Sequence, residues 1–60
     1  MGIEKMSDLV NIWRYDKATG YWKLVRECYR ENAKRWLEIF RQDEPDVTFK
    51  AQRRRPVKAP

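Results

Sequence analysis

The sequence predicts a small α+β domain in which two strands, one helix and a third strand follow one another. Two alternating, aromatic-rich runs flank a polar loop that ends in glycine, which is a strong hairpin signal. The apolar period then changes to that of a helix, and alternation returns after Pro45. We expect a three-stranded antiparallel sheet of order 2-1-3 with the helix packed on one face, because a helical crossover brings the third strand back beside the first.

The hairpin is expected to join a strand from residue 9 or 10 to residue 16 and a strand from residue 21 to about residue 27. Asp16 can accept hydrogen bonds from loop amides, and Thr19 can do so more weakly. Gly20 can adopt a positive φ without steric cost. These turn residues therefore predict where the chain reverses.

The position of the turn also predicts the register of the hairpin. If the loop closes between Tyr15 and Trp22, Trp13 faces Leu24 and all four side chains share one side of the ribbon. The pattern Trp-x-Tyr-Asp-x-Ala-Thr over residues 13–19 resembles the C-terminal hairpin of the immunoglobulin-binding domains of protein G. This resemblance implies similar turn chemistry and no shared function.

The helix is expected from Tyr29 to Gln42, ending before Pro45 because a residue that precedes proline avoids the helical region. Its apolar stripe consists of Tyr29, Ala33, Trp36, Leu37 and Phe40. Alternation from residue 46 to residue 52 predicts the third strand. We expect the stripe to cover Trp13, Tyr15, Trp22 and Leu24, with Val47 and Phe49 completing the core.

The opposite sheet face should then be uncovered, since the sequence predicts only one helix. That face would carry Val10, Ile12, Tyr21 and Val25 among charged side chains. An apolar patch with a charged rim is typical of a homodimer or partner-protein interface. A partly apolar solvated face is the alternative.

Charge is unevenly distributed along the 60 residues. The net charge of +5 equals the contribution of residues 49–60, which contain five basic and no acidic side chains. We expect residues 1–8 to be a frayed lead-in, residues 9–52 to form the domain, and residues 53–60 to be a disordered tail, because the tail has two prolines and little to bury. The basic residues are Lys50, Arg53, Arg54, Arg55 and Lys58.

The residue types present favour a non-enzymatic role without a cofactor. Histidine is absent, so the usual general base and the usual zinc ligand sets are missing. Cys28 is the single cysteine, which excludes an internal disulfide and fits a reducing, cytoplasmic location. It is either a small packed residue or a thiol activated by the helix N-terminus. The acidic cluster of Asp43, Glu44 and Asp46 is typical of a helix exit. No run is apolar enough to span a membrane.

Basic tails bind nucleic acid, bind acidic protein surfaces or simply aid solubility. The sequence leads us to expect nucleic-acid binding of weak sequence specificity through the five tail cations. Arg14, Tyr21 and Lys23 would be secondary contacts on the exposed sheet face.

A second resemblance covers residues 33–49 followed by Arg53-Arg54-Arg55-Pro56, which look like the C-terminal half of small phage and prophage proteins. It implies an accessory protein that acts by binding. The alternative function is therefore an inhibitor or adaptor of a host protein.

Overall fold

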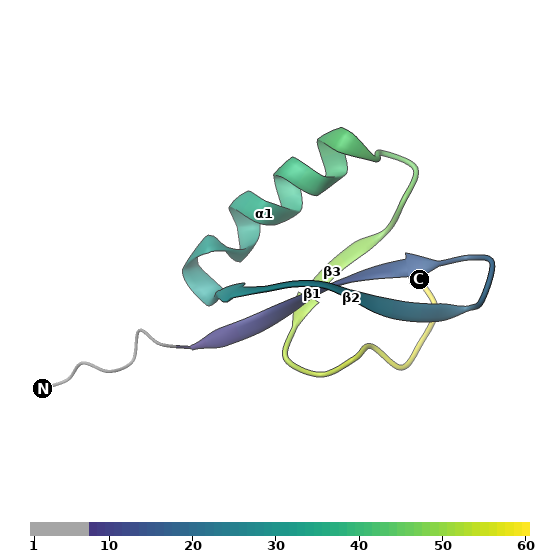
Figure 1. Cartoon of the computed structure of the whole chain (residues 1–60), viewed down its shortest axis with the longest axis horizontal. Coiled ribbons are helices and arrows are strands. Elements are labelled where there is room, and N and C mark those ends of the chain that lie inside the picture. The colour runs from purple at the N-terminus through teal and green to yellow at the C-terminus, as the bar shows by residue number, and fades with distance from the viewer. Residues whose placement is uncertain (1–7) are drawn as a thin grey trace, which may run out of the picture.

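The computed structural model describes residues 8–60 and shows one helix and a three-stranded antiparallel sheet (Figure 1). The elements are β1 (Leu9–Asp16), β2 (Tyr21–Tyr29), α1 (Arg30–Asp43) and β3 (Phe49–Gln52). Their order in the sheet is β2-β1-β3. The predicted fold class, element order and sheet order are confirmed. Most of the predicted lead-in lies outside the described residues.

The turn between β1 and β2 uses the predicted residues. Asp16 accepts a hydrogen bond on Oδ1 from the Ala18 amide at 3.0 Å and, on its backbone oxygen, one from the Gly20 amide at 2.7 Å. Thr19 Oγ1 accepts from the Tyr21 amide at 3.3 Å. Gly20 has a φ of 76°, a conformation that favours glycine. The register that this turn sets, with Tyr15 opposite Trp22, is confirmed.

A β-bulge interrupts the hairpin at Val25. Trp13 lies opposite Leu24 and Ile12 lies opposite Arg26, so Val25 has no residue opposite it. An extra residue on one strand shifts the alternation of every residue beyond it. As a result, Cys28 shares a face with Val10 and Ile12, although strict alternation along β2 would place it with Trp22.

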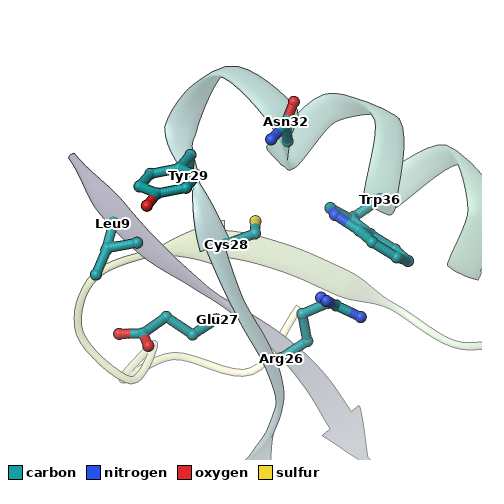
Figure 2. Close-up of a pocket in the computed structure, with 7 residues that line it drawn as sticks. All are labelled: Leu9, Arg26, Glu27, Cys28, Tyr29, Asn32 and Trp36. Atoms are coloured by element: carbon teal, nitrogen blue, oxygen red, sulfur yellow. The ribbon is translucent and has the colours of Figure 1, made fainter. Parts of the chain in front are cut away.

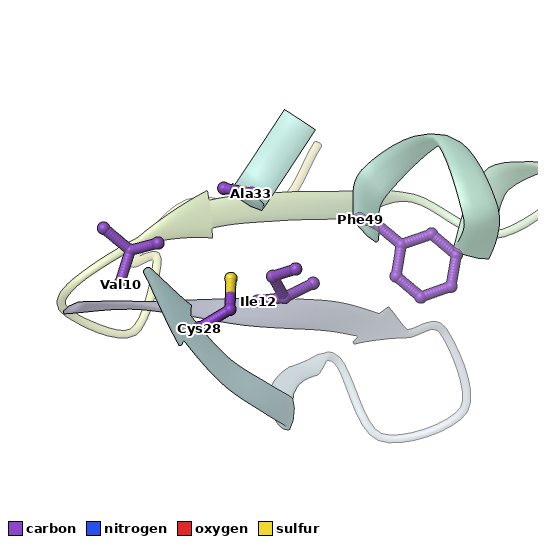
Figure 3. Packing of buried hydrophobic residues seen from close by; sticks show 5 residues of the cluster. All are labelled: Val10, Ile12, Cys28, Ala33 and Phe49. Atoms are coloured by element: carbon purple, nitrogen blue, oxygen red, sulfur yellow. The ribbon is translucent and has the colours of Figure 1, made fainter. Parts of the chain in front are cut away.

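The helix covers the face of the sheet that carries Val10 and Ile12, and the predicted core face was wrong. Buried Val10, Ile12, Cys28, Ala33 and Phe49 form the core cluster (Figure 3). Trp36, Leu37, Phe40, Val47 and Ala51 pack against it. The expected open interface at Val10 and Ile12 is therefore the centre of the domain.

The register of β3 explains this choice of face. Phe49 lies opposite Arg14 and Ala51 lies opposite Ile12, so both project toward the helix with Ile12. The ring of Phe49 stacks on Phe40 with centroids 5.4 Å apart, and Phe40 stacks on Trp36 at 5.8 Å. Four residues of the predicted stripe, Ala33, Trp36, Leu37 and Phe40, thus face the core, but they meet the other side of β1. Tyr29 does not belong to the stripe, because it ends β2 and is exposed.

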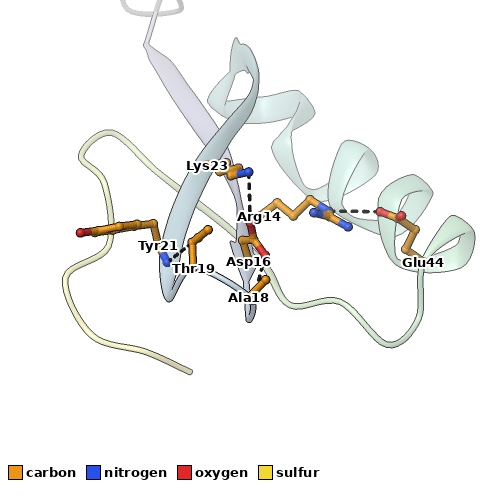
Figure 4. Close-up of polar contacts among 7 residues, drawn as sticks. All are labelled: Arg14, Asp16, Ala18, Thr19, Tyr21, Lys23 and Glu44. Carbon is orange, nitrogen blue, oxygen red and sulfur yellow. Dashed lines mark hydrogen bonds and ion pairs between the residues drawn. The ribbon is translucent and has the colours of Figure 1, made fainter.

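The chain after β3 crosses the remaining face of the sheet, opposite the helix (Figures 1 and 4). We call residues 53–60 the basic strap. Trp13 and Trp22 lie on this face and are 6% and 4% exposed, and Pro56 of the strap is buried as well. The predicted disordered tail is therefore corrected to a segment packed on the sheet, because two tryptophans on the second face supply an apolar surface for it.

Replacing the most deeply buried side chain tests the assignment of the core face. Ile12→Ala should lower the free energy of unfolding by about 2–5 kcal/mol, since Ile12 is fully buried beneath the helix. Leu24→Ala is the control, because Leu24 is 56% exposed and its loss should cost far less. Urea unfolding followed by circular dichroism measures both. A larger loss for Leu24→Ala than for Ile12→Ala would contradict the assignment.

Removing the strap should destabilise the domain. A chain ending at Gln52 loses the Trp22 indole hydrogen bond and the cover that Pro56 gives to the second face. The hydrogen bond alone contributes about 0.5–1.5 kcal/mol, and the uncovered apolar area adds to it. Urea unfolding and a red shift of tryptophan emission would report the change. A chain ending at Lys58 is the control, and equal stability of all three chains would show that the strap does not pack.

Candidate nucleic-acid interface

Two indole N–H groups donate to the backbone just before the strap and near its end. Trp13 Nε1 donates to the backbone oxygen of Gln52 at 3.0 Å, and Trp22 Nε1 donates to that of Lys58 at 3.1 Å. Pro56 is buried between these two points. Buried tryptophans satisfy their single donor in this way, so their need for a partner fixes where the strap lies.

The start of the strap is held by amide side chains. Asn11 Nδ2 donates to the backbone oxygen of Arg53 at 2.9 Å, and Gln52 Nε2 donates to that of Arg54 at 2.7 Å. The guanidinium carbon of Arg55 lies 5.6 Å from the centroid of the Trp13 ring, which is within the range of a cation–π contact. Arg53 and Arg54 are thus attached through their backbone and Arg55 through its side chain, and all three residues are exposed.

The five predicted tail cations lie on β3 and along the strap that follows it. Lys50 lies opposite Trp13 in the pairing of β1 and β3, and Arg53, Arg54, Arg55 and Lys58 lie along the strap. All five are exposed. Arg53 Nη2 lies 3.8 Å from Asp8 Oδ1. Within residues 8–60, the structure pairs none of the other four with a carboxylate.

Two of the three predicted secondary contacts, Arg14 and Lys23, do not join this surface. Arg14 Nε lies 3.4 Å from Glu44 Oε1, and Lys23 Nζ lies 3.0 Å from Asp16 Oδ2 (Figure 4). Arg14 alternates with Ile12 and so projects to the helix side of the sheet. Both cations are therefore already neutralised by a neighbouring carboxylate, away from the strap. Tyr21 is 66% exposed and points away from the Arg14–Glu44 pair (Figure 4).

The predicted protein interface is divided by the structure. Val10 and Ile12 are buried in the core, at 7% and 0% exposure. Tyr21 and Val25 are exposed on β2, at 66% and 38%. The four residues do not form one surface, so the continuous apolar patch that motivated a homodimer is absent from the described chain.

A shallow hollow of about 470 Å³ opens between the end of β2 and the start of α1. It is lined by Leu9, Arg26, Glu27, Cys28, Tyr29, Asn32 and Trp36 (Figure 2). The guanidinium carbon of Arg26 lies 3.9 Å from the Trp36 centroid. Cys28 is buried in the core, where it packs as a small apolar residue.

Sequence reasoning missed the roles of Trp13, Trp22 and Pro56 in placing the cations. The signal that could have indicated them is two cross-strand tryptophans on one face together with a proline in the tail. Aromatic side chains on a sheet face are stabilised when another segment shields them from water. Proline suits this role, because it offers an apolar ring and loses little conformational entropy on ordering.

Within residues 8–60, no group of three or more His, Cys, Asp or Glu side chains could hold a metal ion. No helix in that range is long and apolar enough to cross a membrane. Comparison with known proteins gives no match to a family model, to a curated protein or to a solved structure. The resemblances to phage proteins and to the protein G hairpin therefore remain predictions from the sequence.

The pKa of Asp16 offers a test of the hairpin contacts. The hydrogen bond from Lys23, followed by that from the Ala18 amide, lowers the pKa of Asp16 below its ordinary value of 3.8. A carboxylate with a lowered pKa stabilises the fold above its unfolded pKa, and this contribution is lost as pH falls through the folded pKa. Asp16→Asn should thus reduce the melting temperature at neutral pH, and the difference from the unsubstituted chain should shrink below pH 3.8.

The control for this measurement is Asp46→Asn, at an exposed carboxylate that the structure pairs with no cation among the described residues. Melting temperatures across the acid range should separate the two variants. A difference for Asp16→Asn that stays constant from neutral to strongly acidic pH would contradict the role of its charge.

Proposed function

We propose that this protein binds nucleic acid, with weak sequence specificity, through the basic strap and Lys50. The observation that carries the proposal is a series of exposed basic residues on a segment whose backbone is hydrogen bonded to the sheet. Phosphate groups attract such residues, and release of their counterions supplies the affinity. The strap is anchored on the sheet, so the cations are presented without the entropy cost of ordering a free tail.

The absence of an evident base reader supports weak specificity. Sequence readout needs side chains that enter a groove and hydrogen bond with base edges. The helix lies on the far side of the sheet from the strap (Figure 1). Its outward residues carry both signs of charge, namely Glu31, Lys34, Arg35, Glu38 and Arg41. Such a surface would repel phosphate nearly as often as it attracts it, so the affinity comes from the strap.

The alternative of a protein-interaction module has less support from the described residues. Its apolar patch depended on Val10 and Ile12, which are covered by α1. Tyr21 and Val25 are exposed but do not form one surface with these buried residues, so the predicted patch of four is not available as an interface. Nucleic-acid binding remains the function that the surface favours.

Neutralising part of the strap tests this function while the strap stays in place. Four cations without an ion pair predict a slope of log affinity against log salt of about −3.6 on duplex DNA. The triple variant Arg54→Gln, Arg55→Gln, Lys58→Gln removes three of them and should make the slope less negative by about 2.7. Fluorescence anisotropy of a labelled duplex, titrated at several salt concentrations, measures both slopes.

The matched control is Lys17→Gln, Lys34→Gln, Arg35→Gln, which removes the same charge from exposed positions in the turn and on the helix. It should leave the slope close to that of the unsubstituted chain. Equal effects of the two triple variants would indicate attraction by net charge alone. No binding by the full chain at low salt would contradict the proposed function.

A further inference from the structure

The aromatic side chains most suited to stacking on bases are covered by the strap. Proteins that bind single strands without sequence preference offer exposed aromatic rings on which successive bases stack. Here Trp13 and Trp22 are 6% and 4% exposed. Tyr15 is partly buried, and its ring lies against Trp22 with centroids 5.2 Å apart. None of these three rings presents a free face beside the cations.

The exposed aromatic side chains on the sheet are too far apart to replace them. Tyr21 and Tyr29 stand at opposite ends of β2. Eight residues of extended chain separate them by about 26 Å. Such a separation gives no row of neighbouring stacking positions, so single-stranded bases would gain little from the protein beyond phosphate contacts.

The strap cannot leave the sheet without exposing the buried Trp13 and Trp22 and breaking the hydrogen bond from Trp22 to Lys58. The hydrogen bonds from Asn11 to Arg53 and from Trp22 to Lys58 hold the start and the end of the strap, and Pro56 is buried between them. The backbone positions from which the strap cations project are therefore held in place. Held attachment points suit the regular spacing of the phosphates in a duplex, and a duplex has a higher charge density than a single strand.

We propose that the basic strap selects double-stranded over single-stranded nucleic acid. The strap stays packed against Trp13 and Trp22 while the protein is bound to the duplex. This inference rests on the proposed function and adds the class of nucleic acid. In it, the indole of Trp22 is a positioning group, because its hydrogen bond to the Lys58 backbone keeps the last cation of the strap on the binding face.

The first test compares two probes of equal length, a 20-base-pair DNA duplex and a 20-nucleotide oligo-dT, with the full chain. Four phosphate contacts give slopes of about −3.6 on the duplex and −2.8 on the single strand. If the two probes bind equally at about 1 M salt, the duplex should bind about tenfold more tightly at about 50 mM. Tighter binding of oligo-dT would overturn the selection.

The second test measures whether the strap stays packed against Trp13 and Trp22 when the protein binds the duplex. In a Trp36→Phe chain, whose substitution lies on the helix side, Trp13 and Trp22 are the tryptophans that remain. Their accessibility to acrylamide should be unchanged when the duplex saturates the protein. Increased quenching, or loss of emission caused by stacked bases, would show that the strap detaches on binding.

The third test removes one indole donor. Trp22→Phe keeps the charge and most of the ring but frees the Lys58 backbone oxygen, so one phosphate contact should be lost and the duplex slope should become less negative by about 0.9. Trp36→Phe is the matched control and should keep the slope. An unchanged slope for folded Trp22→Phe would overturn the positioning role. If neither probe binds the unsubstituted chain, the proposed function itself fails, an outcome distinct from loss of duplex preference.

Discussion

The structure depends on one constraint, which is that β1 carries large apolar side chains on both of its faces. Ile12 and Trp13 are neighbours in the chain, point to opposite sides and are both buried. A three-stranded sheet with one helix can cover only one of these sides. The chain that follows β3 covers the other side, which carries Trp13. The indole N–H groups of Trp13 and Trp22 donate hydrogen bonds to the backbone at Gln52, the last residue of β3, and at Lys58 of this segment.

The strap that covers the tryptophan face of the sheet also determines where the basic residues of the tail lie. The strap that covers the tryptophans carries the arginines at residues 53–55 and Lys58, so packing and electrostatics are joined in one segment. A chain of 60 residues buries only about 60% of the surface exposed when unfolded, so each covered aromatic ring contributes a large share of its stability. Stability and the proposed binding surface should consequently respond together to changes at Trp22.

Local signals in the sequence predicted the turn, the hairpin register near it, the helical stripe and the sheet order. They could not predict which face the helix covers, because alternation along β1 places apolar residues on both sides. The bulge at Val25 has no distinctive residue, yet it moves Cys28 to the side of Val10. The sequence indicated the five basic residues of the tail. The burial of Pro56 depends on tertiary contacts that composition does not reveal.

The central claim is that the strap is an ordered part of the domain, and backbone ¹⁵N relaxation tests it most directly. The heteronuclear ¹H–¹⁵N NOE of residues 54, 55, 57 and 58 should approach that of β1 and β2, because the strap is held at both ends and Pro56 is buried between them. Values near zero or negative over these residues, with the strands rigid, would show a free tail and contradict the account.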